Sequence, residues 1–538
     1  MNRWREYGAS LFESPDGETP LTKMNRAFDD DMEPPPLMDE VMYAVKKLKD
    51  GKSPGLDGIP AELIKSTGQH GIKALHQLCT CIWIKCDWPN DWKVQEFVML
   101  FKSGDRKQCS NYRTIALISH TSKVLLMIII LRLKAKLDQE LPEEQAAYRK
   151  GRGTVDMLVC LQILMEKIIA IGQKAFIMFI DYSKAFDSVS HIKLFSAMIE
   201  MGFPAHLVAL LQSLYVNQKA KIRWNGENTD EFNLGKGVRQ GCIASPHMFV
   251  SYTEKVMRDA DVNQYGIKVG GIPISNLRYA DDTALFETSE EDIERLTSAV
   301  NDAGRKLNLK LNVKKTKLLT TGEEQPVHNI SIDGEDVEQV SRFKYLGSVK
   351  TTSASCTADI RARIGMAKGR MIELQDLWND RNLTTNLKTK IVKALVWSVL
   401  LYGLEGWTLI KADENRIMAA EMWIWRRMLR VNWKEKRTNI SILKELGVKR
   451  QLLGELIKRK LAYFGHIIRD SGSLLALHII EGKVEGSRKR GRQRKQWFDN
   501  IKEWTGMSLI KAKRLAQDRV AWRKMIRRCD RMAANRHI

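Results

Sequence analysis

The chain has 538 residues, with 87 Lys and Arg against 64 Asp and Glu, which gives a formal net charge of +23. A hydrophobic content of 44% and 14 Trp exclude a mostly disordered chain, and the length allows roughly three or four domains or one large multi-lobed enzyme. Eight Cys without paired spacing argue against a secreted disulfide scaffold and favour a reducing compartment.

The basic charge is concentrated toward the C-terminal end. Residues 1–40 carry 4 basic and 10 acidic side chains, whereas residues 431–538 carry 28 and 10, a net charge of +18. Net charge does not determine a fold, but a basic surface attracts polyanions. We therefore expect residues 431–538 to bind nucleic acid.

No segment predicts export or membrane insertion. Residues 1–12 are polar and charged, unlike a signal peptide, and the most apolar run, Val124–Leu131, is far shorter than the ~20 residues of a membrane span. We expect an intracellular protein of the nucleus and cytoplasm, without a membrane partner.

The predicted elements begin after an acidic, proline-rich linker over residues 1–40, in which Pro34-Pro35-Pro36 cannot continue a helix. Apolar residues at helical spacing then start at Val41, and this helix ends before Gly51. A short apolar segment, Phe97–Phe101, suits a strand. The other helices predicted in this part of the chain span residues 61–88, 114–137 and 155–171.

Two further strands are predicted downstream. Ala175–Ile180 is a continuous apolar run, typical of a strand buried on both faces. Leu277–Phe286 is interrupted by Asp281 and Asp282, which indicate a hairpin tip. Beyond residue 350 the pattern is almost wholly helical. The predicted fold class is therefore α+β, followed by a basic, mainly α-helical C-terminal region.

Asp181, Asp281 and Asp282 each stand where a buried strand ends or breaks. An unpaired buried carboxylate is costly, so such groups are usually paired, protonated or bound to cations. Oxygen-only ligands favour Mg²⁺ or Mn²⁺ over Zn²⁺. Two such ions about 4 Å apart activate a hydroxyl and stabilise a leaving phosphate. The alternative is ordinary turn chemistry at an exposed hairpin and at a strand end.

An ordered series of motifs surrounds these carboxylates and covers most of residues 41–350. In chain order the motifs are Lys52-Ser-Pro-Gly-Leu-Asp-Gly-Ile59, Asn111-Tyr-Arg-Thr-Ile115, Glu144-Gln145 with Tyr148-Arg-Lys-Gly-Arg152, Asp181-Tyr-Ser-Lys-Ala-Phe-Asp187, Arg239-Gln-Gly-Cys242 with Ser245-Pro246, Tyr279-Ala-Asp-Asp282, Asn312-Val-Lys-Lys-Thr-Lys317 and Phe343-Lys-Tyr-Leu-Gly347. Together they resemble the reverse transcriptases of non-LTR retrotransposons. Each motif alone is weak evidence, whereas the whole series in the family's order makes coincidence negligible.

Looser motifs in the tail resemble the C-terminal part of RTE-type elements. They are Tyr402-Gly403 with Glu405 and Trp407, Phe464-Gly-His466, and Arg490-Gly-Arg492 followed by Trp497. In such elements an endonuclease of the apurinic-site type precedes the polymerase. This chain has no room for it, which implies a truncated copy whose endonuclease activity comes from a missing N-terminal domain or from another protein.

The resemblance implies a right-hand polymerase that extends a DNA 3′-OH on an RNA template. Its implied cofactor is a pair of Mg²⁺ ions, with Mn²⁺ as the alternative, and its implied partners are an RNA template, a DNA primer or target and deoxynucleoside triphosphates. The competing interpretation is a catalytically inactive, retrotransposon-derived nucleic-acid-binding protein. The implied domains are a reverse transcriptase domain over 41–350 (fingers 41–175, palm 176–325, primer-grip segment 326–350), a helical thumb over 351–430 and the basic region over 431–538.

The resemblance also implies the metal ligands. Asp181 and Asp281 bridge the two ions, and Asp282 lies closer to the primer terminus. The main-chain carbonyl of Tyr182 is a further possible ligand.

Five residues match the family's nucleotide-binding positions. Lys102 and Arg113 correspond to the residues that hold the triphosphate, where Arg offers a planar fork and Lys a point charge. Phe186 corresponds to a bulky ring under the sugar, which a 2′-hydroxyl would meet. Gln240 and Gly241 correspond to a loop beside the nascent base pair. The alternatives are solvated surface cations for the first two and a core position for the ring.

Lys315 is the implied proton donor to the leaving pyrophosphate, and Lys314 and Lys317 are neighbours that the sequence does not exclude.

The hairpin predicted to grip the primer could equally be a packing corner. Three tryptophans, Trp497, Trp504 and Trp522, follow the basic run, and at least two of them are expected to anchor helices. The implied primer-grip residues are Phe343, Tyr345, Leu346 and Gly347. The implied nucleic-acid-binding residues of the basic run are Lys483, Arg488, Lys489, Arg490, Arg492, Arg494 and Lys495.

Four positions depart from the family pattern without touching the carboxylates. Thr114 stands in place of Pro, Gly153 in place of Ser and Gly406 in place of Thr. Asn308 stands in place of Gly, and we expect it to adopt a left-handed backbone, which Asn tolerates best among non-glycine residues.

Overall fold

The computed structural model describes residues 1–15, 18, 21–23, 32–322, 328–469, 473–488 and 491–535, with side chains described up to residue 530. The chain forms two compact units. Unit 1 comprises Met1–Tyr148, Asp181–Asp261 and Ser298–Asn312, and unit 2 comprises Arg149–Ile180, Val262–Thr297 and Val313–Ile538.

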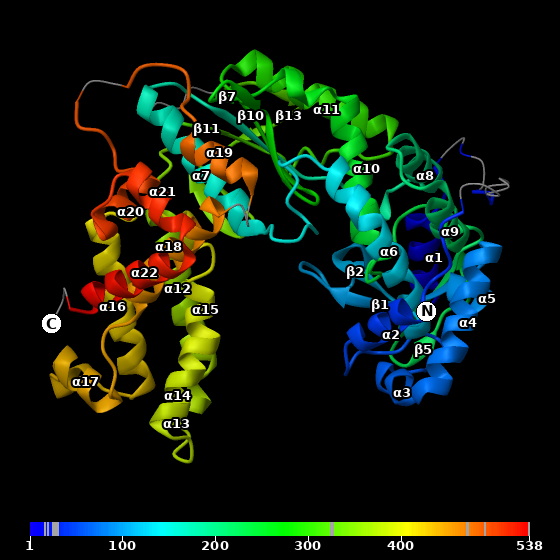
Figure 1. Ribbon diagram of the computed structural model, residues 1–538, viewed down its shortest axis with the longest axis horizontal. Helices are drawn as coiled ribbons and strands as arrows, with labels where there is room; N and C mark the ends of the chain where they lie inside the picture. Colours follow the sequence, from blue (N-terminus) through cyan, green and yellow to red (C-terminus); the bar gives the residue numbers. More distant parts are fainter. Residues whose placement is uncertain are drawn as a thin grey trace. The chain divides into compact units, whose positions relative to one another are not determined.

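A five-stranded sheet forms the framework of unit 1 (Figure 1). Strand β1 pairs antiparallel with β2 and parallel with β4, while β5 and β6 each pair with β4. Phe97 and Met99 alternate along β1 and enter one core with Ile222 of β4 and Phe232 of β6. The strands are β1 (Val94–Phe101), β2 (Tyr112–Leu117), β4 (Lys219–Trp224), β5 (Glu227–Asn228) and β6 (Phe232–Asn233).

The predicted linker over residues 1–40 is corrected at its start. Helix α1 (Asn2–Leu11) packs Trp4, Tyr7 and Leu11 against the sheet core, because the spacing of these residues places them on one helix face. Gly8 lies so close to the sheet that a Cβ atom there would stand 2.6 Å from the ring of Phe232. The acidic cluster Asp29–Asp31 lies outside the described residues.

The helix predicted over residues 114–137 is wrong at its start. Thr114–Leu117 belong to β2, with Ile115 opposite Val98 of β1, and the helix begins only at His120. The sheet partner supplies the main-chain hydrogen bonds of this segment, a long-range effect that local spacing does not reveal. The helical elements of unit 1 after α1 are α2 (Met38–Lys47), α3 (Ala61–Ser66), α4 (Gly68–Lys85), α5 (Asn90–Lys93), η1 (Cys109–Asn111), α6 (His120–Glu140), η2 (Ala185–Asp187), α8 (His191–Glu200), α9 (Ala205–Tyr215) and α10 (Ser245–Asp259).

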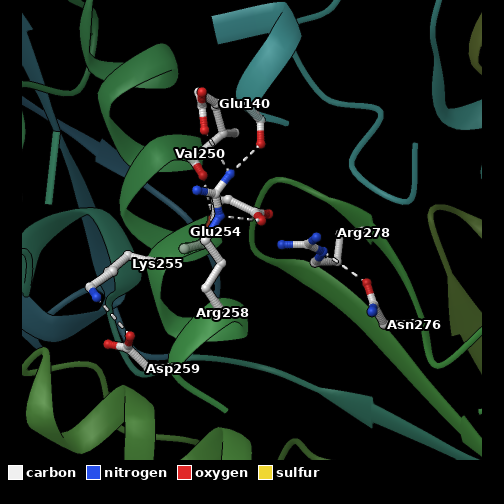
Figure 2. A network of polar contacts seen from close by, with 9 residues as sticks. Glu140, Val250, Glu254, Lys255, Arg258, Asp259, Asn276 and Arg278 are labelled. Atoms are coloured by element: carbon white, nitrogen blue, oxygen red, sulfur yellow. Dashed lines mark hydrogen bonds and ion pairs between the residues drawn. The ribbon is translucent and has the colours of Figure 1, made fainter. Parts of the chain in front are cut away.

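A polar network joins α6 to α10 in unit 1 (Figure 2). The guanidinium of Arg258 donates to the main-chain oxygen of Glu140 at 2.6 Å and to its carboxylate at 3.0 Å. It also pairs with Glu254, one turn earlier on α10, at 3.2 Å. Glu140 ends α6, where carbonyls lack helical partners, so Arg258 caps this helix. Hydrogen bonds from Lys136 and Arg258 hold the pKa of Glu140 below its usual range.

A second five-stranded sheet, with the order β14-β11-β3-β10-β9, forms the framework of unit 2. Its central strand β3 is buried along its whole length and runs antiparallel to both neighbours, as its continuous apolar run predicts. Ile180, the last residue of β3, lies opposite Thr283 of β10. The strands are β3 (Phe176–Ile180), β9 (Asn276–Tyr279), β10 (Asp282–Glu287), β11 (Lys317–Thr320) and β14 (Glu338–Gln339).

Small hairpins and many helices complete unit 2. The helix α11 (Glu290–Lys306) begins in unit 2 and ends in unit 1. The hairpin strands are β7 (Ile267–Val269), β8 (Ile272–Ile274), β12 (Ser331–Ile332), β13 (Glu335–Asp336), β15 (Arg342–Tyr345) and β16 (Ser348–Thr351). The helical elements are α7 (Thr154–Ile171), η3 (Val262–Gln264), α12 (Thr357–Glu373), α13 (Gln375–Asn379), α14 (Thr385–Ile391), the π-helical turn η4 (Val392–Val396), α15 (Trp397–Leu400), η5 (Leu404–Gly406), α16 (Lys411–Met428), η6 (Trp433–Glu435), α17 (Asn439–Leu446), α18 (Leu452–Ile468), α19 (Leu474–Glu481), α20 (Trp497–Thr505), α21 (Leu509–Gln517) and α22 (Arg519–Asn535).

A buried polar network joins the C-terminal helices to α7 within unit 2. The carboxylate of Glu166 on α7 accepts hydrogen bonds from the Thr408 hydroxyl at 2.5 Å and from the main-chain N–H of Trp497 at 2.7 Å. The ammonium of Lys460 on α18 donates to the main-chain oxygen of Trp407 at 2.6 Å and lies 4.7 Å from the Trp497 ring centre. Burial raises the pKa of Glu166 and lowers that of Lys460.

The fold class predicted from the sequence, α+β with a mainly helical C-terminal region, is confirmed. Trp497, Trp504 and Trp522 are buried, as expected for helix anchors, so they do not offer stacking surfaces. Of the helices in the described part of the chain, none is long and apolar enough to cross a membrane.

We expect Trp497→Ala to destabilise unit 2. The substitution removes a ring that is 1% exposed and packs beside Phe464 and Lys460, and leaving a cavity of this kind costs about 3–5 kcal/mol. The measurement is urea unfolding followed by circular dichroism. The matched control is Trp433→Ala, because that ring is 81% exposed and its removal leaves no cavity. Equal unfolding midpoints for the two variants would contradict the anchoring role.

Candidate active site

The turn between β9 and β10 holds two of the predicted catalytic carboxylates. Tyr279 pairs with Asp282, so Ala280 and Asp281 form a two-residue turn, and Ala280 has the positive φ of 59° that such turns require. Asp281 is half-buried in this turn, and Asp282 is the exposed first residue of β10. The predicted hairpin tip is therefore confirmed within unit 2.

The segment that begins at Asp181 is held in unit 1 by main-chain hydrogen bonds. The main-chain oxygen of Asp181 accepts from the N–H of Asn312 at 2.7 Å, and Tyr182 forms a bridge with Leu311. Asn308, just before, has φ 59°, as predicted for this departure from the family pattern, and its amide donates to the main-chain oxygen of Ser188 at 2.9 Å. In the chain, Asp181 directly follows Ile180 of β3.

Phe186, the predicted sugar-contacting ring, is half-buried in unit 1. It stacks on Phe249 of α10 with ring centres 4.2 Å apart and planes inclined by 15°. Its main-chain oxygen accepts from the N–H of Val238 at 2.8 Å. One face of the ring therefore packs against Phe249, and part of the side chain is accessible to solvent.

The predicted loop at Gln240 and Gly241 is joined to two other segments of unit 1. The main-chain oxygen of Gln240 accepts from the N–H of Ala116 on β2 at 2.7 Å, and its side-chain amide donates to Asp187 at 2.8 Å. Gly241 has φ 109°, and a Cβ atom there would stand 2.8 Å from the main-chain oxygen of Ala116. Glycine is therefore required at this close approach.

Asp187 is a site residue that sequence reasoning missed, although it closes the Asp181–Asp187 motif. Burial raises the pKa of Asp187 to about 6, while the hydrogen bond from Gln240 and the charges of Lys184 and Arg113 oppose the shift. The ammonium of Lys184 lies 5.2 Å from the ring centre of Tyr7 on α1. The sequence signal that could have pointed to Asp187 was its position directly after Phe186, at the end of the Asp181–Asp187 motif.

Lys102 and Arg113 lie at the loop end of the β1–β2 hairpin, where residues 102–111 connect the two strands. Arg113 is opposite Leu100, and the N–H of Lys102 donates to the main-chain oxygen of Asn111 at 2.9 Å. Lys102 and Arg113 are both exposed. The hairpin therefore presents two cations on the same unit that carries Phe186.

The lysines after Asn312 differ in their partners. Lys317 on β11 pairs with Glu338 on β14 at 2.9 Å. Lys314 and Lys315 lie in the turn before β11. The ion pair gives Lys317 a structural role across two strands.

The predicted primer-grip segment is a hairpin, with Leu346 and Gly347 in its two-residue turn at φ 44° and 80°. Phe343 stacks on Phe179 of β3 with ring centres 4.3 Å apart. Tyr345 is buried, and its hydroxyl donates to the main-chain oxygen of Leu277 at 3.1 Å. Burial and the charge of Asp282 raise its pKa well above the usual range. The hairpin is thus packed beside the β9–β10 turn in unit 2.

The predicted nucleic-acid-binding cations are described at five of seven positions, because Lys489 and Arg490 lie outside the described residues. Arg488, Arg492 and Arg494 are exposed. Lys495 pairs with Glu503 at 2.5 Å. Burial, assisted by the charge of Arg488, lowers the pKa of Lys167 to about 8.

The described side chains do not form a metal-binding cluster. Among the residues that the structure describes, no three His, Cys, Asp or Glu side chains gather closely enough to hold a metal ion. The metal ligand set of Asp181, Tyr182, Asp281 and Asp282 therefore stays a prediction, supported by donor chemistry.

Comparison with known proteins identifies the family. Residues 102–349 match the family model of the reverse transcriptase (RNA-dependent DNA polymerase). The probable RNA-directed DNA polymerase from transposon BS of Drosophila melanogaster is 25% identical over 84% of this chain and 50% of that protein. Residues 102–349 therefore form a reverse transcriptase domain, and the relatives that this chain matches are RNA-directed DNA polymerases of non-LTR retrotransposons.

The similarity extends beyond this reverse transcriptase domain. The corresponding protein from transposon X-element of Drosophila melanogaster is 24% identical over 78% of this chain and 47% of that protein. The chain thus spans at most half the length of these two relatives. Telomerase from Candida albicans aligns with a TM-score of 0.35 at 11% identity, over 75% of this chain and 67% of the telomerase chain. The RTE-type assignment stays a prediction.

We expect Asp187 to make stability fall with rising pH. Its pKa is about 6 in the folded chain and ~3.9 in an unfolded chain, so the folded state binds the proton more tightly between these values. The stabilising contribution is complete below the lower value and disappears as pH rises through about 6.

Asp187→Asn keeps an oxygen acceptor for Gln240 but cannot ionise, so its melting temperature should fall less than that of the wild type between acidic and neutral pH. Thermal melts across this range measure the difference. Asp230→Asn, at an exposed position of the same unit, should retain the wild-type profile. An identical pH profile for Asp187→Asn and the wild type would contradict the assignment.

Proposed function

We propose that this chain is an RNA-directed DNA polymerase that extends a DNA 3′-OH on an RNA template and serves retrotransposition. The observation that carries the proposal is the register of β3 and β10. Ile180 lies opposite Thr283, and each is the chain neighbour of one of the family's aspartates, Asp181 and Asp282. The family match over residues 102–349 supports the same activity.

The donor set fits divalent metal ions. Asp181, Asp281 and Asp282 would hold them, with the main-chain carbonyl of Tyr182 as a further ligand. All of these donors are oxygen atoms, which favours two Mg²⁺ ions, or Mn²⁺, over Zn²⁺. Ions held by these oxygen donors would supply positive charge that activates the primer hydroxyl and neutralises the leaving pyrophosphate.

The chain's own side chains would position the incoming nucleotide. Lys102 and Arg113, on the β1–β2 hairpin, bind the triphosphate, with the guanidinium as a bidentate fork. Phe186 lies under the sugar and is held by its stacking on Phe249. Gln240 and Gly241 approach the nascent base pair, and the hydrogen bond to Asp187 orients the Gln240 amide.

Proton transfer and primer binding would come from unit 2. Lys315 protonates the leaving pyrophosphate, and the ion pair of Lys317 with Glu338 makes that lysine a poorer donor. The hairpin with Phe343, Tyr345, Leu346 and Gly347 supports the primer strand. Tyr345 is buried and Phe343 is stacked, so both act as packing anchors. The turn and the exposed edge of the hairpin would therefore contact the primer.

The basic segment at Lys483–Lys495 would dock the RNA template or the DNA target by its charge. Its exposed cations, Arg488, Arg492 and Arg494, suit phosphate contacts that do not depend on base sequence.

Asp281→Asn should abolish primer extension on an oligo(dT)-primed RNA template in the presence of Mg²⁺. The substitution removes a charged metal ligand while preserving size, so folding and RNA affinity should stay close to wild type. Circular dichroism and RNA binding provide the controls. If the wild type itself fails to extend but binds RNA, the inactive nucleic-acid-binding alternative is correct. Extension by the variant at the wild-type rate would refute the two-metal assignment.

Phe186→Val should raise the incorporation of ribonucleotides relative to deoxynucleotides. The smaller side chain leaves room beneath C2′, where the ring would meet a 2′-hydroxyl. The measurement is the ratio of kcat/KM for dGTP and GTP. The comparison variant is Phe249→Leu, which removes the stacking partner but keeps the Phe186 ring, so it should change the ratio less than Phe186→Val does. An unchanged ratio for Phe186→Val would assign the ring to the core alone.

A further inference from the structure

Trp433 is exposed to solvent to an unusual degree. Its side chain is 81% exposed, whereas Trp497, Trp504 and Trp522 are buried. All 14 tryptophans lie in the described part of the chain, and Trp433 alone among them is an exposed large hydrophobic residue. It sits in η6, between α16 and α17 of unit 2.

The turn that carries Trp433 is held in place by local hydrogen bonds. The side chain of Asn432 accepts from the N–H of Lys434 at 3.1 Å, and the carboxylate of Glu435 accepts from the N–H of Asn432 at 2.6 Å. These reciprocal bonds form a capping box, which fixes the backbone around the ring. The ring is therefore presented outward by an ordered turn.

A second anchor ties the end of this loop to α16. The guanidinium of Arg426 donates to the main-chain oxygen of Arg437 at 2.7 Å and to the side chain of Asn439 at 3.0 Å. Arg437 also pairs with Glu445 on α17. The loop is thus fixed at both ends, which lowers the entropy that binding to the ring would cost.

The surroundings of Trp433 are cationic. Arg430, Lys434 and Lys436 are exposed, and none of them forms an ion pair with the residues that the structure describes. The nearby acid Glu435 is occupied by the capping box. An exposed aromatic face beside unneutralised cations complements a ligand that has both planar faces and negative charge.

We propose that Trp433 is a base-stacking platform for single-stranded RNA, with Arg430, Lys434 and Lys436 as its phosphate contacts. A double helix hides its base faces, so the ligand is a single strand. The choice of RNA rests on the proposed function, because the template is the long single strand of that reaction. An acidic protein partner or self-association would use the same exposed ring and is tested as the competing outcome.

The experiment measures binding of the full chain to a labelled single-stranded RNA by fluorescence anisotropy, without nucleotides. Trp433→Ala should weaken binding by about 5- to 150-fold, the range expected when one base stack is removed. Trp433→Phe should recover most of the affinity. A strand of equal length with abasic spacers should bind wild type and Trp433→Ala alike, because it has no bases to stack.

The matched control is Ile440→Ala. Ile440 is 67% exposed and seven residues from Trp433 along the chain, but it offers no ring for stacking. Its removal should leave RNA affinity unchanged. Lys434→Gln with Lys436→Gln should flatten the salt dependence by ~0.7 in log–log slope for each phosphate that is no longer neutralised, whereas Trp433→Ala should keep the slope.

Two results would overturn the inference. One is equal RNA affinity for wild type and Trp433→Ala, or an equal weakening on the abasic strand. The other is a change in oligomeric state, seen by sedimentation, in both Trp433→Ala and Ile440→Ala without a change in RNA affinity. Because the assay needs no extension, a wild type that binds through Trp433 but fails to polymerise would refute the proposed function and leave this inference standing.

Discussion

The antiparallel pairing of β3 with β10 is the constraint on which the proposed site depends. A slip of one residue would turn every side chain of β3 to the opposite face of the sheet. Slippage is opposed on both edges, because β3 also pairs with β11, where Thr320 lies opposite Phe176. All residues of β3 are buried, so another register would pack each apolar side chain against the wrong neighbours. This register pairs Ile180 with Thr283, and Asp181 and Asp282 are the chain neighbours of these two residues.

Main-chain hydrogen bonds organise the corresponding part of unit 1. The loop around Gln240 is joined to β2 through Ala116 and to the Phe186 segment through Val238. Such bonds do not depend on side-chain identity, except where the backbones approach so closely that only glycine fits, as at Gly241. The functional side chains extend from this fixed backbone. The carboxylate of Asp187, rather than packing, orients the amide of Gln240. A proposed nucleotide site built in this way tolerates change in the surrounding sequence.

The basic C-terminal region has both a core and a charged surface. Glu166 of α7 binds the N–H of Trp497, and Lys460 of α18 binds the main-chain oxygen of Trp407. The desolvation of these two buried charged groups is offset only while their hydrogen bonds are complete. Removing one partner would therefore be far more damaging than removing a surface cation. Exposed positive charge lies in loops, at Arg492 and Arg494 and around Trp433, and also on α22, at Arg523, Lys524, Arg527 and Arg528. Nucleic-acid contacts placed there can change while the fold stays intact.

The sequence by itself determined the fold class, the buried central strand, the hairpin at Asp281 and the family, because these depend on continuous apolar runs and on the order of short motifs. It also determined the left-handed backbone at Asn308, a local property of one residue. Only the tertiary structure decided that Thr114–Leu117 is a strand, since its hydrogen-bond partner lies in β1. It also decided that Trp497 is enclosed and Trp433 is exposed, although both follow basic residues in the chain. Burial depends on what distant segments pack against a side chain, and no local pattern records those partners.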